Sequence, residues 1–359
     1  MKKKLSLLLA GVMTLSLMSG CFKQTPPPAE PAPPKEPEVV EPAPAPEPEA
    51  DKEIYEVNFA ALSGPTGVGA AQMLYAHGVP EGGQDHAPAA MLVNYFIAAS
   101  NDEITPALIN GTLDIAAVAT NLAATLNAKT NGGVQVLCVN TLGVLYILEK
   151  GDSVHSMADL EGKTLYAPAN TKGANPEHIL THLLDENGVD IADVNIEWLT
   201  PQEITAKMTT EDAGICMLPV PAATAVMVKD PSVRQAISLS EAWEAVEETP
   251  LPMGCIVART QFVEENPEAV ARFLEIYKDS VTYIADEANR ADAAEKVAQL
   301  GVTPNAAIAA KAIPQCNLTF VTGNEMKDML QDYYQILFQT SSASIGGSMP
   351  YDSFYYGAQ

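Results

Sequence analysis

Residues 61–74 read ALSGPTGVGAAQML, and this stretch joins a predicted strand to a predicted helix. The apolar run before it ends at Ser63 and Gly64, and a helical pattern starts at Gly69. Glycines at such a junction let the backbone approach a bound ligand, and the first turn of a helix offers unpaired N–H groups. The junction is therefore either one wall of a binding site or a plain connection between strand and helix.

Two nucleotide-binding motifs can be tested against this junction, and the residues match neither. A P-loop places a lysine and then Ser or Thr after its last glycine, whereas Gly69 is followed by Ala70 and Ala71. The dinucleotide motif G-x-G-x-x-G needs a third glycine, and Gln72 stands in its place. We therefore expect no nucleotide cofactor here.

Residues 1–20 have the features of an export signal. Lysines at 2–4 precede an apolar core that is too short to span a bilayer, and small residues stand directly before Cys21. This ending resembles a lipobox, the site at which bacterial lipoproteins are cut and the new terminal cysteine is acylated. Cys21 is therefore expected to carry a lipid. The alternative is an ordinary signal peptide followed by a chance cysteine.

Residues 21–53 are rich in proline and glutamate, as in PPPAEPAPPKEPE at 26–38. Proline cannot donate a backbone hydrogen bond, and neighbouring glutamates repel one another, so the segment cannot build a core. We expect an extended tether, with the folded part beginning at about Ile54. The formal net charge of −25 argues against nucleic-acid partners and against direct binding to anionic lipids.

From Ile54 to Ala258, apolar runs of strand length alternate with helical patterns. The predicted strands are 55–62, 91–98, 115–119, 134–141, 145–149, 164–167, 195–199, 213–218, 235–239 and 254–258. The predicted helices between them are 69–77, 103–110, 122–130, 176–187, 201–210, 222–229 and 240–247. After Ala258 the pattern is helical, at 267–287, 291–300, 305–311 and 324–339. Repeated strand-then-helix units predict an α/β protein with parallel sheets covered on both faces.

The junction at residues 63–69 has a counterpart in the middle of the chain. LYAPANTKGANPEHIL, residues 165–180, again reads as strand, polar turn and helix, and Pro176 suits an early helical position. Ligands of open parallel sheets bind beyond the carboxyl ends of the strands, where helix N-termini point. We therefore expect two similar lobes whose turns face one cleft.

Three longer stretches carry motifs that can be compared with known proteins. EITPALINGTLDIAAVATNLAA at 103–124 contains G-x-x-D-I-A. VLYILEKGDSVHSMADLEGKTLYAP at 144–168 contains S-x-x-D-L-x-G-K, and ENPEAVARFLEIYKDSVTYI at 265–284 has a helical pattern. These stretches resemble, in this order, the passage into the site, the lobe crossing and the C-terminal helix of bacterial solute-binding proteins of ABC importers, in the nitrate, sulfonate, taurine and thiamine-precursor group. The resemblance covers about 54–338.

This resemblance implies a two-lobed type II periplasmic-binding fold, with two doubly wound lobes joined by a two-segment hinge. Lobe 1 would comprise 54–142 plus 256–359, and lobe 2 would comprise 143–255. A hinge of this kind closes because the ligand binds the closed form better than the open form. The cysteines that follow Cys21 are expected to be buried, although Cys138 and Cys255 could pair because both lie near the lobe crossings.

The candidate ligand-binding residues are polar groups at the predicted strand ends. Asn121 could either hold the ligand or cap the following helix, and the two readings are equally supported. Many relatives place Glu-Pro where this chain has Val220 and Pro221, which removes a charge suited to a cationic ligand. The complete set is Ser63, Thr66, Gly67, Thr120, Asn121, Asn140, Thr141, Asn170, Thr171, Lys172, Pro219 and Val220.

This set contains one charged residue, Lys172, which is equally well explained as a solvated loop lysine. A dianionic ligand would normally recruit an arginine, so we expect a small neutral or singly charged solute, with Tyr75, Tyr146 or Tyr166 as possible apolar contacts. We expect no metal. His178 and His182 lack a third ligand and are read as a solvated helix face, and a loop site of His77, Asp85 and His86 is a weaker alternative.

The resemblance implies a monomeric, lipid-anchored receptor that captures a small solute and delivers it to an ABC permease. It would lie at the outer face of the cytoplasmic membrane, held only by the lipid on Cys21, with a Gram-positive surface favoured over a periplasm. One alternative is a sensor or surface protein without transport. The other is an enzyme of the same fold acting on a thiamine- or menaquinone-type precursor, for which Cys216 and His178 are the available groups.

Overall fold

The computed structural model describes residues 54–80 and 91–359. The predicted export signal, the lipidation site Cys21, the tether and the loop with Asp85 and His86 lie outside the described residues. Among the residues described, no helix is long and apolar enough to cross a bilayer.

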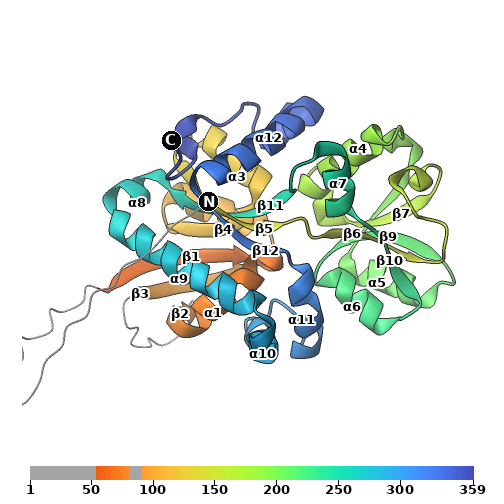
Figure 1. Cartoon of the computed structure of the whole chain (residues 1–359), viewed down its shortest axis with the longest axis horizontal. Coiled ribbons are helices and arrows are strands. Elements are labelled where there is room, and N and C mark those ends of the chain that lie inside the picture. Colours follow the sequence, from red (N-terminus) through yellow and green to blue (C-terminus); the bar gives the residue numbers. More distant parts are fainter. Residues whose placement is uncertain (1–53, 81–90) are drawn as a thin grey trace, which may run out of the picture. The chain divides into compact units, whose positions relative to one another are not determined.

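The larger sheet has seven strands in the order β12-β5-β11-β4-β1-β3-β2 (Figure 1). They are β1 (Tyr55–Leu62), β2 (Gly78–Pro80), β3 (Met91–Ala98), β4 (Ile115–Ala119), β5 (Val134–Leu142), β11 (Pro252–Arg259) and β12 (Leu318–Val321). β1 runs parallel to β3 and β4. β11 is antiparallel to β4 and β5, because the chain re-enters this sheet from the opposite end after it has built the smaller sheet.

The smaller sheet has five strands in the order β10-β6-β9-β7-β8. They are β6 (Leu145–Lys150), β7 (Thr164–Pro168), β8 (Asn195–Leu199), β9 (Gly214–Pro219) and β10 (Val233–Ser238). β7 is parallel to β8 and β9, but β6 is antiparallel to β9 and β10. Both sheets are therefore mixed, and the prediction of parallel sheets was wrong for the strands beside each crossing. The α/β class is confirmed.

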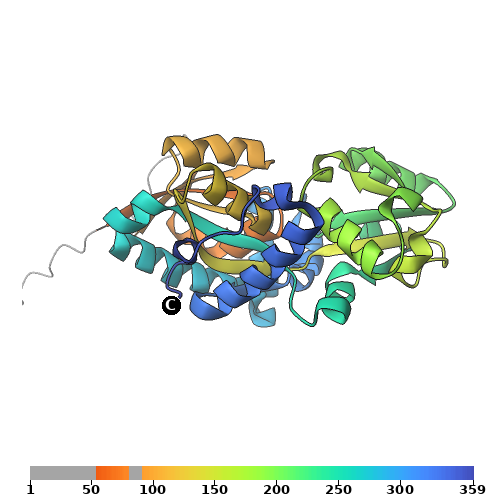
Figure 2. The same cartoon turned by 90° about the horizontal axis from the view of Figure 1, so that it is seen from above.

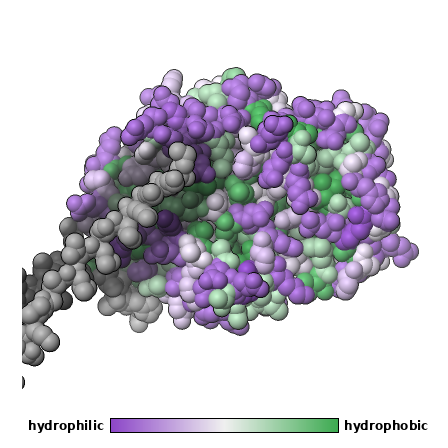
Figure 3. Space-filling view, in the orientation of Figure 1, coloured by the Kyte–Doolittle hydropathy of each residue, from purple (hydrophilic) through white to green (hydrophobic). Residues whose placement is uncertain are grey.

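Helices cover both faces of each sheet (Figures 1 and 2). They are α1 (Pro65–His77), α2 (Asn101–Asn110), α3 (Thr120–Lys129), α4 (Asn175–Glu186), α5 (Pro201–Thr210), α6 (Ala222–Lys229), α7 (Leu239–Glu247), α8 (Thr260–Glu265), α9 (Pro267–Ala285), α10 (Arg290–Gln299), α11 (Ala306–Ala312) and α12 (Gly323–Ser341). Hydrophilic residues cover most of the face seen in Figure 3, while hydrophobic residues form smaller groups.

Strand β1 shows how the alternation of side chains builds the core. Val57, Phe59 and Ala61 are fully buried and pack in one cluster with α1 and α9. The ring of Phe59 lies 5.5 Å from that of Phe273, which in turn stacks on Tyr277 at 5.8 Å. This packing holds Tyr277 in a fixed position beneath the sheet, where it contributes to the site described below.

The cysteine residues Cys138, Cys216, Cys255 and Cys316 are all free and buried. Cys138 and Cys255 lie on the neighbouring strands β5 and β11, but their side chains belong to the cores on opposite faces of the larger sheet. A disulfide cannot pass through the sheet, so the alternative of a Cys138–Cys255 pair is excluded.

We expect this arrangement to give a simple thiol count. Burial raises the pKa of the Cys216 and Cys316 thiols to about 12, so neither reacts at neutral pH in the folded protein. Residues 54–359 should show almost no reactive thiol when native and four after unfolding without reductant. A count of two after unfolding, measured with a chromogenic disulfide reagent, would contradict the structure.

Candidate functional site

The junction at residues 63–69 is shorter than predicted, because helix α1 already begins at Pro65. Proline favours the first helical position, where its missing N–H is not needed. A Cβ atom on Gly67 would lie 2.8 Å from the carbonyl oxygen of Leu62, and one on Gly69 would lie 3.1 Å from the hydroxyl of Tyr277. These glycines therefore let α1 pack tightly against β1 and α9, and the loop at this position comprises only Ser63 and Gly64.

Several predicted site residues converge on Gly254, at the start of β11. Gly254 pairs with Ala119 at the end of β4 and with Thr141 near the end of β5. A Cβ atom on Gly254 would lie 2.6 Å from Thr66 Cγ2, 2.7 Å from Asn140 Oδ1 and 3.0 Å from Thr141 Cβ. The first turn of α1 and the ends of β4 and β5 therefore meet at one point, which we call the Gly254 site.

Two polar atoms of the Gly254 site are buried and have no hydrogen-bond partner. They are Asn140 Oδ1 and Thr141 Oγ1, and both residues are at most 1% exposed. The other end of the Asn140 amide donates from Nδ2 to the Tyr277 hydroxyl at 2.7 Å. Buried polar groups in folded proteins almost always have partners, so two unpartnered neighbours indicate a place for a polar ligand.

Tyr277 fixes the orientation of Asn140. Its hydroxyl is completely buried, and burial raises the pKa of Tyr277 above its ordinary value of 10.0. It therefore stays neutral at all physiological pH values and retains its bond to the Asn140 amide. Sequence patterns do not predict this role, because Tyr277 lies in α9, far along the chain from Asn140.

Thr120 and Asn121 lie beside this site at the start of α3. The Thr120 hydroxyl donates to the carbonyl oxygen of Pro252 at 2.8 Å, which ties α3 to β11. Asn121 makes no capping bond, and its Nδ2 donates to the carbonyl oxygen of Ser344 at 3.3 Å. The capping interpretation of Asn121 is therefore excluded, because α3 begins at Thr120 and Asn121 is already helical.

The remaining predicted residues belong to the smaller sheet. Thr171 is buried, and its hydroxyl donates to the carbonyl oxygen of Pro168 at 2.6 Å. Asn170 is exposed, and so is Lys172, whose Nζ lies 5.9 Å from the centre of the Trp198 ring. Pro219 is the last residue of β9 and Val220 follows it. Because β9 is parallel to β7, the turns after these two strands lie at the same edge of the smaller sheet.

One residue that the sequence analysis missed connects the helices of the two sheets. Asn175, the first residue of α4, is buried, and its Oδ1 accepts a hydrogen bond from the Tyr333 hydroxyl of α12. The Tyr333 ring lies 5.6 Å from that of Trp243 in α7. Asn175 Nδ2 and Trp243 Nε1 are buried without partners. A polar residue directly before Pro176 at a helix start was the available signal.

The sequence predicts that the histidines of α4 form a solvated helix face, and this prediction was wrong. His182 is only 11% exposed, pairs with Glu247 at 2.5 Å, and packs against the Trp243 ring at 5.1 Å. Burial lowers the pKa of His178. Within 54–80 and 91–359, no group of three or more His, Cys, Asp or Glu residues is placed to hold a metal ion.

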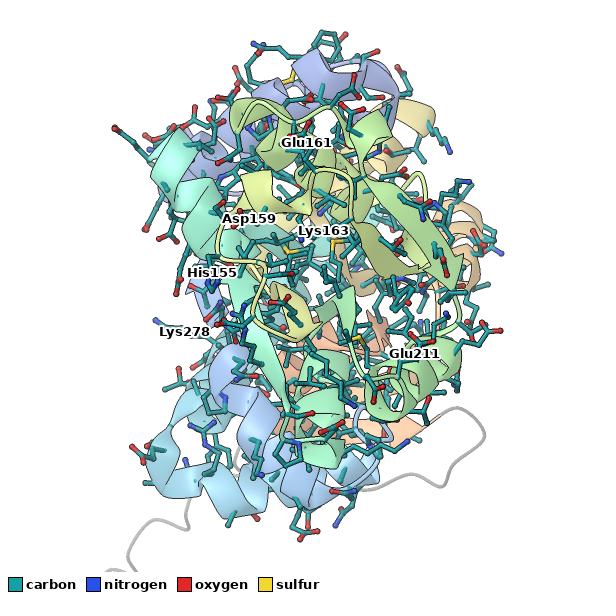
Figure 4. The ribbon with its side chains drawn as sticks, turned by 90° about the vertical axis from the view of Figure 1, so that its right-hand side faces the viewer. His155, Asp159, Glu161, Lys163, Glu211 and Lys278 are labelled. Atoms are coloured by element: carbon teal, nitrogen blue, oxygen red, sulfur yellow. The ribbon has the colours of Figure 1, made fainter. Side chains whose placement is uncertain are left out.

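The S-x-x-D-L-x-G-K turn is a structural motif. Asp159 accepts backbone hydrogen bonds from His155 and Ser156 at 2.9 Å each, and these bonds lower the pKa of Asp159. The turn also carries Glu161 and Lys163, and Figure 4 labels these residues around the smaller sheet. The side chains of Ser156 and Asp159 bond to each other and to the backbone of the turn, so these residues of the motif stabilise the turn.

Two mixed sheets, each between helices, with polar groups gathered at the strand ends, define the type II periplasmic-binding fold of ABC-importer substrate-binding proteins. An ABC transporter protein from Parabacteroides distasonis has this fold, with a TM-score of 0.68 and 19% identity over 83% of this chain and 98% of that one. The aliphatic sulphonate binding protein SsuA of Escherichia coli has a TM-score of 0.63 and 15% identity over 82% and 89%.

The family of this protein is shown by a match between its sequence and a family model. A family model described as NMT1/THI5 like matches residues 93–291, and the chain belongs to this family. A protein of Brucella abortus strain 2308, named as a binding protein, is 22% identical over 150 residues. That stretch is 42% of this chain and 45% of the relative, so the match spans less than half the length of either protein.

Proposed function

We propose that this protein is an extracytoplasmic solute-binding lipoprotein that captures a small solute between two lobes and delivers it to an ABC permease. The observation that carries the proposal is the pair of buried, unpartnered polar atoms on Asn140 and Thr141. They lie where helix α1 begins and where strands of the larger sheet end, which is the expected position of a ligand in this fold. Membership of a family that includes transport binding proteins supports it.

The lobes predicted from the sequence are 54–142 plus 256–359 and 143–255. Since β11 pairs within the larger sheet from Pro252 onward, we propose that the return crossing lies just before that residue, so that 252–255 belong to lobe 1. Contacts between the two parts include a bond from Thr224 Oγ1 to Gln315 Oε1 at 2.7 Å. A solute that bridges the lobes would add to such contacts and favour the closed form.

The chemistry of the Gly254 site favours a neutral or singly charged solute. Thr66, Asn140 and Thr141 carry no charge, and one end of the Asn140 amide needs a partner. The solute would thus offer at least one hydrogen-bond donor or acceptor to each of two neutral groups. The proposed contacts are Ser63, Thr66, Gly67, Thr120, Asn121, Asn140, Thr141, Asn170, Thr171, Lys172, Pro219 and Val220.

The setting in the cell follows from the sequence. An acyl group on Cys21 would hold a monomer at the outer face of the cytoplasmic membrane, and residues 21–53 would provide the reach to a permease. The proline-rich acidic tether favours a Gram-positive surface. Mass spectrometry of the purified lipoprotein would test the anchor by the mass of its N-terminal peptide. An unmodified peptide beginning before or after Cys21 would contradict it.

Replacing Thr141 with valine is expected to separate binding from stability. Its hydroxyl has no partner, so an isosteric methyl group should leave the free energy of unfolding unchanged or raise it by up to about 1 kcal/mol. Affinity for the solute should fall about tenfold, because one hydrogen bond is lost. Thermal melting and calorimetric titration would measure both.

Thr120→Val is the control for the stability measurement of that experiment. The Thr120 hydroxyl does have an acceptor, the Pro252 carbonyl, so this variant should lose about 1 kcal/mol of stability. If Thr141→Val destabilised the protein as much as Thr120→Val and bound the solute normally, Thr141 would not be a ligand contact.

Native mass spectrometry of residues 54–359, purified gently from cells, tests the proposal as a whole. We expect a small non-covalent adduct that is lost on denaturation and that identifies the solute. If no adduct appears, a thermal-shift screen of sulfonates, thiamine precursors, amino acids and small anions should contain a stabilising compound. Failure of both measurements would reject the solute-binding function.

The alternative functions are an enzyme of the same fold and a sensor without transport, and each can be distinguished from a transport protein. An enzyme of the same fold would need a nucleophile at the cleft, but Cys216 is fully buried, and burial raises its pKa to about 12. This argues against Cys216 as a catalytic group. A sensor without transport would also bind a solute, so uptake of that labelled solute by cells with and without the gene separates it from a transport protein.

A further inference from the structure

A polar cavity lies between helices α1 and α9, away from the Gly254 site. Its volume is about 220 Å³, and its walls include Gln72 and His77 from α1 and Arg272 and Asp279 from α9. The two helices are fixed together beside it by Ser280, whose hydroxyl accepts from Met73 N at 2.9 Å and donates to Gly69 O at 2.8 Å. The cavity is therefore bounded by a rigid helix pair.

Three polar atoms of this cavity are buried and have no hydrogen-bond partner. They are Gln72 Oε1, His77 Nδ1 and Arg272 Nε. Each unpartnered buried group costs a folded protein free energy, so three of them around one cavity point to an occupant. The side chains of Met73 and Ile276 also line it, and these apolar surfaces are unsuited to a cavity filled by water alone.

The hydrogen-bonding character of the walls can be assigned. Burial lowers the pKa of His77, so its ring is neutral at pH 7, and a ring nitrogen bonds to the backbone of Met91. That bond leaves Nδ1 as an acceptor. Gln72 Oε1 is a second acceptor, and Arg272 Nε is a donor. The cavity therefore offers two acceptors and one donor.

The charges around the cavity exclude ionic occupants. A metal cation would lie beside the guanidinium group of Arg272, which would repel it. A small anion would meet the carboxylate of Asp279, and the Arg272 guanidinium group that could attract it already pairs through Nη1 with Glu275 at 2.5 Å. A neutral molecule faces neither penalty.

We propose that this cavity binds a small neutral polyol. Two of its hydroxyl groups would donate to Gln72 Oε1 and His77 Nδ1, and one would accept from Arg272 Nε–H. Its carbon atoms would pack against Met73 and Ile276. This site is separate from the Gly254 site and does not depend on the solute that the Gly254 site takes.

Titration of the full mature chain with glycerol tests the proposal. The probe is the imidazole ¹⁵N signal of His77, followed by NMR, with His155, His178 and His182 as internal references. We expect a saturable shift of the His77 signal in the millimolar range and no saturable shift of the references. Gln72→Met should weaken binding about fivefold, because it removes one acceptor and keeps the side-chain length. Gln335→Met, on the exposed face of α12, should bind glycerol normally.

Three results would overturn the proposal. The absence of a saturable His77 shift would mean that ordered water alone fills the cavity. A saturable His77 shift with nitrate or zinc but not with glycerol would assign it to an ion. Equal glycerol affinity in wild type and Gln72→Met would place the polyol elsewhere. If Gln72→Met does not fold, the comparison of His77 with the reference histidines in the wild type still decides the question.

Discussion

Replacing Gly254 with alanine is expected to lower the affinity for the solute about a hundredfold. The added carbon would lie 2.6 Å from Thr66 Cγ2 and 2.7 Å from Asn140 Oδ1, where no real Cβ is found. It would displace Asn140 and fill the space that a ligand needs between that amide and the first turn of α1. Calorimetric titration with the identified solute gives the measurement.

A control glycine separates this effect from the general cost of an added methyl group. Gly214, in β9 of the smaller sheet, meets as its nearest neighbour the flexible sulfur of Met208 at 3.1 Å. Gly214→Ala should therefore bind the solute normally. Overpacking at Gly254 should also cost about 2 kcal/mol of stability. Normal solute affinity in Gly254→Ala would show that the ligand does not occupy the Gly254 site.

Much of the fold could be predicted because the chain alternates apolar and polar residues with clear periods. The strands at Met91–Ala98 and Ile115–Ala119 and the helices at Pro201–Thr210 and Ala222–Lys229 have the predicted bounds. Two strands and one α-helix of the described residues were missed, β2, β12 and α8, because each is short. Strand direction was also missed, since periodicity reports which residues are buried and contains no information on whether neighbours run parallel.

The site was only partly accessible from the sequence. Thr66, Asn140 and Thr141 were found by the rule that ligands bind at strand ends, and the structure brings them together. Gly254 could not be found in this way, because its importance comes from its register against β4 and β5. Register depends on contacts between segments far apart in the chain, and those contacts are not visible in local patterns.

The glycines of the first junction have a role in packing that the local pattern does not show. The sequence predicts that glycines at this junction make room for a ligand. In the structure, Gly67 and Gly69 make room for Leu62 and Tyr277. The same tight packing fixes the start of α1, so the glycines still contribute to the site, through the position of Thr66.

Replacing Glu149 with alanine is expected to lower the free energy of unfolding by about 3 kcal/mol, more than any other substitution that we predict. The carboxylate is 2% exposed and accepts hydrogen bonds from Ser153 N at 2.8 Å and Val154 N at 3.1 Å. It also pairs with Arg234 at 2.5 Å, which joins the end of β6 to β10. Without the carboxylate, two backbone N–H groups lose their acceptor inside the smaller sheet, and Arg234 loses its buried ionic partner and keeps only the Gly151 and Val154 carbonyl oxygens as acceptors there.

The same carboxylate predicts a pH dependence with a definite sign. Burial alone would raise the pKa of Glu149, but the hydrogen bonds from Ser153 and Val154 and the charge of Arg234 lower it below its ordinary value of 4.5. Because the folded pKa lies below the unfolded one, the stabilisation is complete above about pH 4.5 and is lost as the pH falls through the folded pKa.

Denaturant unfolding at pH 7 and at pH 3 would measure the loss of stability in Glu149→Ala and its dependence on pH. The wild type should lose more stability between these pH values than Glu149→Ala, since the variant no longer carries the titrating group. Glu161 is an exposed residue of the neighbouring turn, so Glu161→Ala should have the same free energy of unfolding as the wild type at both pH values. If Glu149→Ala were as stable as Glu161→Ala at pH 7, the Glu149 network would not hold the smaller sheet together. Apolar packing alone would then hold together the smaller sheet, which belongs to the proposed lobe 2.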